Sequence, residues 1–448
     1  MSTIKESYMK EITMKKLAGV VAVLFFFTIS VNLFAKGGGQ QASSPGGISG
    51  TLTFWHQYND ADPSNLGATW MRENVRLFRE RYPDVRLEIT NISGSSNEYL
   101  TKITTEIAAG RTPDVFETYL TGRLEPYVTA GRVAPLNSLV ESNPDLKRTI
   151  SPKALALATF GNNYYAIPTV KSAELIYYNK KIFTDNGLQV PKSYDEFMRN
   201  CSVLKAKGIT PVVCGNLDIW PGAMPYMMLF NRMNGNALYE EVVVGHKAKF
   251  DDPAFAETGK KLQEMFNAGV FNASINSMKY DEAQVEFTSG RAAMTFDGAW
   301  NIGLYYNRLG DDLGIFNFPM VPGGKGTAND WLVNYDTAFA ISSNSRNRPA
   351  AEALMSLIFS PERMAAFTEM GMMAASVNLP VDTSKIRPIM LELSNGIDNA
   401  NYGNIPWDNP LGSGMGNEFN LAVQRCYAGE DPVRVFQNLN NIVKVEWQ

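Results

Sequence analysis

The sequence predicts an α/β protein built from two units, and three observations lead to this prediction. Its 448 residues exceed one ordinary domain, since single domains usually run on the order of 100 to 200 residues. Strand-like alternation and helix-like spacing of apolar residues follow one another twice, over 50–116 and over 175–296. Because strands that alternate with helices form parallel sheets with crossover helices, we expect one such sheet in each unit.

Local patterns predict the individual elements. Gly50 to Trp55 alternates as a strand does, Tyr82-Pro83 is a stop signal for the helix before it, and Ser193 is an expected helix N-cap. The first unit has predicted strands at 50–55, 85–89 and 114–116 and helices at 70–81 and 99–109, and the second has strands at 175–178, 210–214 and 292–296 and helices at 194–207, 225–233 and 255–268.

The amino terminus has the order of a secretory signal peptide. Met14-Lys15-Lys16 precedes an apolar run over 17–33, and small residues follow it. A permanent membrane anchor is the alternative, because a run of roughly 17 apolar residues lies at the lower edge of what spans a bilayer. Polar residues inside the run favour cleavage. We therefore expect a signal peptide over 1–35, cleaved near Ala35, and a flexible tether rich in Gly, Ser and Gln over 36–49.

Charge and cysteine content exclude several classes of function. Lys and Arg number 41 against 45 Asp and Glu, so no basic field favours a nucleic-acid partner. With two histidines and no C-x-x-C motif, we expect no metal or other cofactor. No cysteine follows the apolar run, so a lipid anchor is not expected. Cys201 and Cys214 could pair in an oxidising compartment if their geometry allowed, although buried free thiols are favoured for these two and for Cys426.

Eight segments, taken in order, resemble the family 1 extracellular solute-binding proteins, the group that includes maltose-binding protein. Each motif alone is weak, but their common order over residues 52–347 is specific. They are LTFWH at 52–56, FRERYPDV at 78–85, AAGRTPDVF at 108–116, YYAIP at 164–168, IYYNKKIF at 176–183, PKSYDEF at 191–197, FTSGRAAM at 287–294 with GAW at 298–300, and ISSNSRN at 341–347.

This resemblance implies a two-lobed, type II-like periplasmic-binding-protein fold. Each lobe is then a sheet flanked by helices, and the chain crosses between the lobes three times. Lobe one is expected to comprise 50–170 plus 319–360 and lobe two 171–318 plus 361–448, with crossings at 168–171, 318–320 and 359–361. The resemblance also implies a function: an extracytoplasmic, monomeric component of an ABC importer that captures a sugar or small oligosaccharide and delivers it to a membrane permease.

A sugar site needs flat aromatic surfaces for the C–H faces and polar side chains for the hydroxyls. Residues of both kinds follow the predicted strand ends, where ligands of α/β sheets lie. The resemblance implies that Trp300 of the G-x-W motif stacks on the ligand. The expected ligand-binding residues are Trp55, Gln57, Asp60, Thr118, Tyr119, Lys171, Trp220, Asp297, Trp300, Trp331, Asn334 and Trp407.

Other interpretations of these residues remain open. A loop tryptophan can fill a core instead of a cleft, and Lys171 with Glu174 can be a solvated hinge pair. The same fold can bind a polyamine, a metal chelate or a glycerol phosphate. A secreted glycosidase with Glu117 and Asp297 as paired carboxylates is less favoured. The chain has no G-x-S-x-G, H-E-x-x-H or P-loop motif, so we expect it not to be an enzyme.

Overall fold

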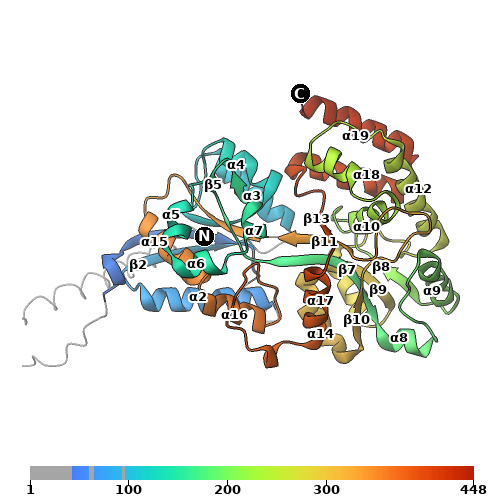
Figure 1. Cartoon of the computed structure of the whole chain (residues 1–448), viewed down its shortest axis with the longest axis horizontal. Coiled ribbons are helices and arrows are strands. Elements are labelled where there is room, and N and C mark those ends of the chain that lie inside the picture. The colour runs from blue at the N-terminus through green and yellow to red at the C-terminus, as the bar shows by residue number, and fades with distance from the viewer. Residues whose placement is uncertain (1–42, 60–64, 93–95, 336, 448) are drawn as a thin grey trace, which may run out of the picture. The chain divides into compact units, whose positions relative to one another are not determined.

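The computed structural model describes residues 43–59, 65–92, 96–335 and 337–447 (Figure 1). The expected signal peptide, the first part of the expected tether and Asp60 therefore lie outside the described residues. Two sheets organise the described part, and we call the sheets with their covering helices lobe one and lobe two. This matches the α/β prediction with two units.

The sheet of lobe one has five strands in the order β2-β1-β3-β12-β6. β1 pairs in parallel with β2 and β3, as predicted, whereas β12 pairs antiparallel with both β3 and β6. The carboxyl end of β3 at Tyr119 lies beside the first residue of β12, Thr337. The strands are β1 (Gly50–His56), β2 (Val85–Asn91), β3 (Val115–Tyr119), β6 (Ile167–Pro168) and β12 (Thr337–Ile341).

Helices cover both faces of this sheet because its strands are apolar on both sides. Along β12, Phe339 and Ile341 belong to one buried cluster, whereas Ala338 and Ala340 belong to another. The first cluster lies under α2 (Leu66–Arg81), α5 (Asn137–Ser142), α6 (Pro144–Thr149), α15 (Arg348–Ile358) and α16 (Pro361–Glu369), and the second under α3 (Ser96–Ala108) and α4 (Glu125–Thr129) (Figure 1).

The sheet of lobe two is mixed, which differs from the parallel sheet predicted. Its long strand β7 runs antiparallel to β9, β10 and β11, and only the pairs β8–β9 and β11–β13 are parallel. The reason is that β7 comes directly from lobe one and runs away from the crossing, whereas β9 runs back and ends at Gly298 beside Glu174. The strands are β7 (Lys171–Asn179), β8 (Thr210–Val213), β9 (Ala292–Gly298), β10 (Leu313–Phe316), β11 (Asp330–Tyr335) and β13 (Tyr402–Asn404).

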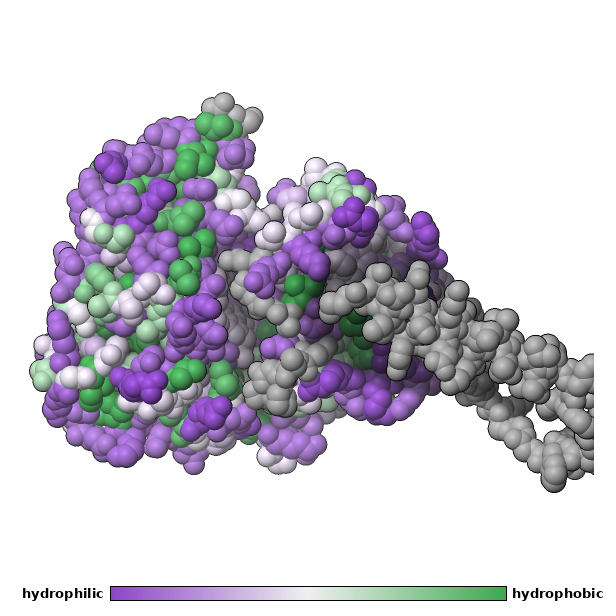
Figure 2. All heavy atoms as spheres, turned by 180° about the vertical axis from the view of Figure 1, so that it is seen from behind, coloured by the Kyte–Doolittle hydropathy of each residue, from purple (hydrophilic) through white to green (hydrophobic). Residues whose placement is uncertain are grey.

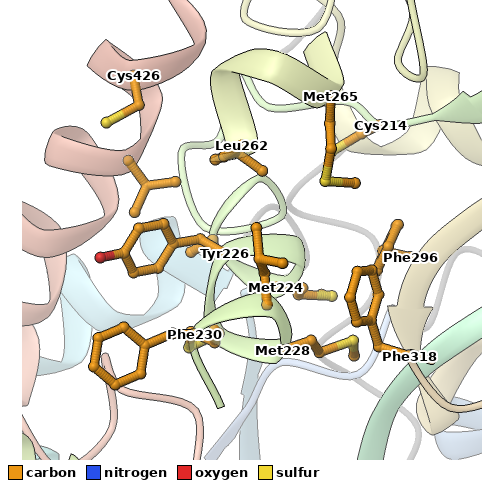
Figure 3. Packing of buried hydrophobic residues seen from close by; sticks show 14 of the residues in the cluster. Cys214, Met224, Tyr226, Met228, Phe230, Leu262, Met265, Phe296, Phe318 and Cys426 are labelled. Carbon is orange, nitrogen blue, oxygen red and sulfur yellow. The ribbon is translucent and has the colours of Figure 1, made fainter. Parts of the chain in front are cut away.

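The larger core of lobe two lies between this sheet and five helices. Tyr226 and Phe230 lie on one helix of this core, and Phe296 and Phe318 approach it from the sheet side (Figure 3). The helices are α9 (Tyr194–Ala206), α10 (Ala223–Asn234), α12 (Pro253–Ala268), α18 (Gly412–Tyr427) and α19 (Pro432–Glu446), and the opposite face is covered by α13 (Tyr280–Thr288), α14 (Ile302–Leu309) and α17 (Pro388–Asp398).

The first chain crossing lies where the sequence predicts it, but the other two do not. β6 belongs to lobe one and β7 to lobe two, so the chain crosses at 168–171. The second crossing, predicted at 318–320, lies between Tyr335 and Thr337, because β11 completes its register with β7 before the chain reaches β12. Residues 319–335 therefore pack in lobe two.

The third crossing, predicted at 359–361, also lies later in the chain. α16 stays in lobe one, where the ring of Phe367 packs 4.7 Å from that of Trp70. The chain then passes beside the first crossing, since the Lys171 amide donates to the Met373 carbonyl. It stays with lobe one as far as Leu379, which packs on the core of that lobe, and it joins lobe two at α17. The second and third crossings were misplaced because prolines 319 and 361 resemble connectors, but Pro361 opens a helix.

The last part of the expected tether is part of the fold. Ser44 is buried, its amide donates to an Asp84 carboxylate oxygen at 2.8 Å, and its hydroxyl accepts from the Asp84 amide at 3.0 Å. Hydrogen bonding from Ser44 to the carboxylate, chiefly from the Ser44 amide, lowers the pKa of Asp84. The prediction of a flexible tether over 36–49 is therefore wrong for the residues from Ser43 onwards, which are part of the fold.

Ser193 caps α9 as predicted, because its hydroxyl accepts from the Glu196 amide at 3.3 Å. All three cysteines are free and buried, and burial raises the pKa of the Cys426 thiol to about 12.

Within the described ranges, no helix is long and apolar enough to cross a membrane. Large apolar side chains lie mainly inside, and the face in Figure 2 is mostly hydrophilic with small separate apolar areas.

The remaining α-helices are short and connect the elements above. They are α7 (Pro152–Ala156), α8 (Lys180–Asp185) and α11 (Ala237–Tyr239). A small hairpin of β4 (Thr159–Phe160) and β5 (Asn163–Tyr164) completes the described strands.

Candidate functional site

A cleft of about 410 Å³ lies where the carboxyl ends of strands from both lobes meet. Its volume falls within the range typical of small-molecule sites, which is roughly 300 to 1,000 Å³. Lobe one contributes the ends of β1 and β3, and lobe two contributes the turn after β8, the end of β9 and the segment before α18. This is the position expected for a ligand of α/β sheets.

Three aromatic rings form one wall of the cleft on lobe two. The ring centroid of Trp220 lies 4.7 Å from that of Tyr280 and 6.0 Å from that of Trp300. The indole Nε1 of Trp300 donates to the phenol oxygen of Tyr280 at 2.8 Å. We call these three residues the aromatic platform. It offers flat apolar surface with few rotatable bonds, which is what the C–H face of a ring-shaped ligand can stack on.

A steric constraint explains the glycine of the G-x-W motif. A Cβ atom placed on Gly298 would lie 2.2 Å from the ring of Trp300. Only glycine therefore lets the indole lie across the end of β9. The backbone of this turn is fixed as well, because the hydroxyl of Tyr177 donates to the Gly298 carbonyl at 3.0 Å.

Trp220 is held in the cleft by a strained turn after β8. Ile219 has a φ of 63°, a region that β-branched residues rarely adopt. The fully buried Asn216 closes the turn, because its side-chain oxygen accepts from the Gly222 amide at 2.8 Å. This conformation places the Trp220 ring against Tyr280 and Trp300 at the edge of the core.

A buried carboxylate orients the platform from behind. Asp297 is 1% exposed and accepts hydrogen bonds from the Tyr280 hydroxyl at 2.6 Å, the Asn301 amide nitrogen at 2.9 Å and the Gly298 amide at 2.7 Å, and also from the Tyr305 hydroxyl. Burial raises the pKa of Asp297, although these hydrogen bonds oppose the rise. Burial also raises the pKa of Tyr280 well above its ordinary value. The phenol therefore keeps its proton and donates a hydrogen bond to Asp297.

The wall on lobe one is polar. The Gln57 side-chain nitrogen donates to one Glu117 carboxylate oxygen at 3.2 Å and to the Tyr119 hydroxyl at 3.2 Å. The Gln57 backbone amide donates to the other Glu117 oxygen at 2.9 Å. Gln57, Glu117 and Tyr119 all line the cleft. This network fixes an amide, a carboxylate and a hydroxyl opposite the lobe that carries the platform.

Buried amides and hydroxyls near the crossings complete the lining. The Asn409 side-chain nitrogen donates to the Asn334 side-chain oxygen at 3.1 Å. Three lining atoms, Asn409 Oδ1, Thr337 Oγ1 and Arg123 Nε, are buried and have no hydrogen-bond partner among the described residues. Such groups are costly to bury unsatisfied, so they are well suited to bind ligand hydroxyls.

The structure brings five of the predicted site residues together in the cleft. These are Gln57, Tyr119, Trp220, Trp300 and Asn334. Asp297 lies directly behind them and orients the platform, so it does not line the cleft itself.

The other predicted residues that the structure describes lie elsewhere. Trp407 is 1% exposed and packs among core rings of lobe two, with Phe419 at 4.8 Å. Trp331 packs against α17 near Gly396, and Trp55 lies against the α3 side of its sheet with Lys102 over its ring. Each of these three indoles packs against nearby apolar surface, and all three therefore lie outside the cleft.

Thr118 and Lys171 also lie outside the lining. Thr118 is buried between strands and its hydroxyl donates to the Tyr119 carbonyl at 3.2 Å. The Lys171 ammonium donates to an Asp398 carboxylate oxygen at 2.7 Å, so it forms an ion pair at the crossing with α17 and not with Glu174. Glu174 itself lines the cleft.

Sequence reasoning missed Tyr280, Arg123, Asp408 and Asn409, which line the cleft. Tyr280 opens a helix far from any strand end, and Asp408 and Asn409 lie in a loop whose partners come from remote segments. The Pro/Asn/Gly-rich composition of 404–412 does predict a loop, but the residue of this loop that was predicted to bind the ligand was Trp407. Among the described residues, no group of three or more His, Cys, Asp or Glu side chains is arranged to hold a metal ion.

A family model described as bacterial extracellular solute-binding protein matches residues 60–365 of this chain. Among curated proteins, an uncharacterized ABC transporter extracellular-binding protein of Pyrococcus horikoshii is 28% identical over 52% of this chain and 52% of its own length. That match thus spans about half of either protein. The multiple sugar-binding protein of Streptococcus mutans is 23% identical over 67% of this chain and 69% of its own length. The diacetylchitobiose binding protein of Streptomyces coelicolor is 23% identical over 76% and 78%.

Solved structures show the same two-lobed fold. A structure from work on xylan utilization by Caldanaerobius polysaccharolyticus superposes with a TM-score of 0.80 at 28% identity, covering 87% of this chain and 99% of that one. A chitin oligosaccharide binding protein superposes with a TM-score of 0.81 at 23% identity, covering 88% and 98%. The expected two-lobed fold of solute-binding proteins is confirmed.

Proposed function

Because this chain belongs to the bacterial extracellular solute-binding proteins, we propose that it is the substrate-binding component of an ABC importer and captures a sugar or small oligosaccharide in the cleft. The observation that carries the proposal is the aromatic platform of Trp220, Tyr280 and Trp300, which faces a cleft whose lining also includes amides, hydroxyls and carboxylates. Flat apolar surface combined with directed hydrogen-bonding groups is the complement of a pyranose ring.

Relatives support this ligand class. Curated relatives are named for binding multiple sugars, diacetylchitobiose and maltotriose. In this chain, Gln57 and Tyr119 of lobe one and Asn409 of lobe two would bind hydroxyls, while Trp300 stacks on a ring face. A polyamine site would surround its amines with carboxylates, and a phosphate site would gather arginines. Among the described lining residues Arg123 is the one arginine, and it is paired with Asp408, which disfavours the phosphate alternative.

The ligand would bind by drawing the two lobes together. A ligand that contacts both walls has more contacts when the lobes are closed, so it shifts the population towards that state. Small-angle X-ray scattering should show a smaller radius of gyration at saturating ligand, and an unchanged radius would exclude closure.

Export and delivery complete the proposal. Residues 1–35 would direct secretion, the mature chain would act outside the cytoplasm without a lipid, and it would hand its ligand to the permease subunits as a monomer. Mass spectrometry of the protein from its native host tests the processing: a retained segment 17–33 or an acylated N-terminus would exclude it.

Isothermal titration calorimetry tests the function. Neutral mono- and oligosaccharides, including diacetylchitobiose, maltotriose and raffinose, are titrated into ligand-free protein, with spermidine and glycerol 3-phosphate as controls. We expect one-site binding of at least one saccharide and recovery of that saccharide intact. Binding of a control alone would contradict the proposed ligand class, and hydrolysis of the bound saccharide would contradict a purely binding role.

A further inference from the structure

Away from the chain crossings, the lobes also touch on the wall of the cleft. The turn after β3, Thr121–Arg123, belongs to lobe one, and the loop 406–411 that leads into α18 belongs to lobe two. The Arg123 guanidinium donates to an Asp408 carboxylate oxygen at 2.9 Å, and the two side chains are only 10% and 17% exposed. A pair so enclosed is screened little by salt.

Glycines allow the backbones of the two lobes to meet beside this ion pair. A Cβ atom on Gly122 would lie 2.4 Å from the Pro410 carbonyl oxygen and 2.9 Å from the Gly412 nitrogen. A Cβ atom on Gly412 would in turn lie 3.0 Å from the Gly122 carbonyl oxygen, and Gly412 has a φ of 77°. No other residue type fits at Gly122 without separating the two segments.

Both segments are held in place from their own lobes. In lobe one, Thr121 has a strained φ of 53°, and the Arg123 guanidinium lies 4.9 Å from the ring centroid of Tyr119. In lobe two, the Pro410 carbonyl lies 2.9 Å from the His246 ring nitrogen Nε2, and Asn409 bonds to Asn334. Strain of this kind persists only where the surrounding structure fixes the conformation.

The geometry points to a latch between the lobes, made by Gly122 and Arg123 on one side and by Asp408 and Gly412 on the other. It limits how far the lobes open before a ligand arrives, so that the ligand has only the remaining closure to complete, and it thereby sets the affinity of the cleft. A ligand that bridges both walls binds more tightly when the bridging arrangement is already populated. The effect on affinity rests on the proposed sugar-binding function, whereas the latch itself does not.

Distance measurements between the lobes test the latch without any ligand. Spin labels are attached to the mature protein at Thr101→Cys on α3 and Arg434→Cys on α19, both exposed positions. The native cysteines are buried with raised thiol pKa values, so they react slowly. Double electron–electron resonance then compares the parent with Gly122→Ala and Asp408→Asn.

Gly414→Ala is the matched control, because a Cβ atom there meets nothing within 4 Å. We expect a narrow distance distribution in the parent and in Gly414→Ala, a shifted and broader one in Gly122→Ala, and an intermediate one in Asp408→Asn. Thermal unfolding of each variant verifies that both lobes are folded. Asp408→Asn keeps the test valid if Gly122→Ala does not fold, because it removes the charge without adding an atom.

The saccharide identified by calorimetry should bind Gly122→Ala about tenfold more weakly than the parent, and Gly414→Ala within twofold of it. Identical distance distributions in the parent, Gly122→Ala and Asp408→Asn would overturn the latch, and so would a broad distribution in the parent itself. If no saccharide binds but the distances shift as expected, the proposed function fails while the latch stands.

Discussion

The Trp300 indole donates a 2.8 Å hydrogen bond to the Tyr280 hydroxyl, which in turn donates to Asp297 at 2.6 Å. Through this chain a carboxylate that is 1% exposed and lies outside the cleft fixes the orientation of a ring inside it. Asn301 adds a second link, since its side-chain nitrogen donates to Asp297 at 2.9 Å. The platform is therefore preorganised, which reduces the ordering cost of binding.

Tyr280→Phe should loosen the platform while keeping its area. The variant removes the acceptor of Trp300 and one donor to the buried Asp297, so we expect a loss of roughly 1 to 3 kcal/mol in unfolding free energy. Affinity for the ligand should fall by about three- to tenfold. Denaturant unfolding and calorimetry measure the two effects. Unchanged affinity would show that the hydrogen bond does not orient Trp300.

Trp300→Ala should weaken binding strongly, by about ten- to a hundredfold, because stacking of one ring in a desolvated cleft contributes roughly 1 to 3 kcal/mol. Trp331→Ala is the matched control: its indole packs on α17 and does not line the cleft. That variant should lower stability and leave the dissociation constant within about twofold. Equal losses of affinity in the two variants would contradict the stacking role.

Trp407→Ala should act on stability, because Trp407 lies in the core of lobe two against Tyr226, Phe230 and Phe419. The cavity should cost roughly 3 to 5 kcal/mol of unfolding free energy, measured by denaturant titration. An unchanged unfolding transition together with a loss of ligand affinity would instead show that Trp407 acts in the cleft.

Asp114 should make lobe one sensitive to acid. Although burial opposes ionisation, hydrogen bonds from the Thr53 amide and hydroxyl, the Ser345 hydroxyl and the Arg346 amide lower the pKa of Asp114 below its ordinary value of 3.8. A lowered folded-state pKa gives stability that is present above the unfolded pKa and is lost as the pH falls through the folded one.

The Asp114→Asn variant should therefore lose about 1 to 2 kcal/mol of unfolding free energy at neutral pH. Below about pH 4 its stability should fall less steeply than that of the parent. Chemical unfolding at a series of pH values checks this. If the unfolding free energies of the two proteins fell equally steeply with falling pH, the role of Asp114 would be contradicted.

Local patterns were sufficient to predict most elements, because buried strands and amphipathic helices have distinct periods. β1 and α9 begin where their sequences predict, and Ser193 caps α9. The second and third crossings were not predictable from proline positions. β11 and β12 are separated by one residue and belong to different sheets, which only the pairing with β7 and β3 reveals.

The candidate site was predicted in part for a similar reason. Trp300 carries a local signal, since Gly298 must be small beneath its ring. Trp220 and Trp407 both lie in loops that contain Gly, Asn and Pro, yet Ile219 turns Trp220 into the cleft while core rings enclose Trp407. Strand-end position alone does not distinguish them, because the difference lies in contacts between distant segments.

Nuclear magnetic resonance of the tryptophan indoles tests the central claim most directly. The protein is labelled with ¹⁵N-tryptophan, its indole signals are assigned with single Trp→Phe variants, and the saccharide that binds in calorimetry is titrated in. We predict that the Nε1–H signals of Trp220 and Trp300 shift in proportion to saturation, while those of the buried Trp70 and Trp407 stay nearly unchanged. A saccharide that saturates the protein without shifting the Trp220 and Trp300 signals would contradict capture on the aromatic platform.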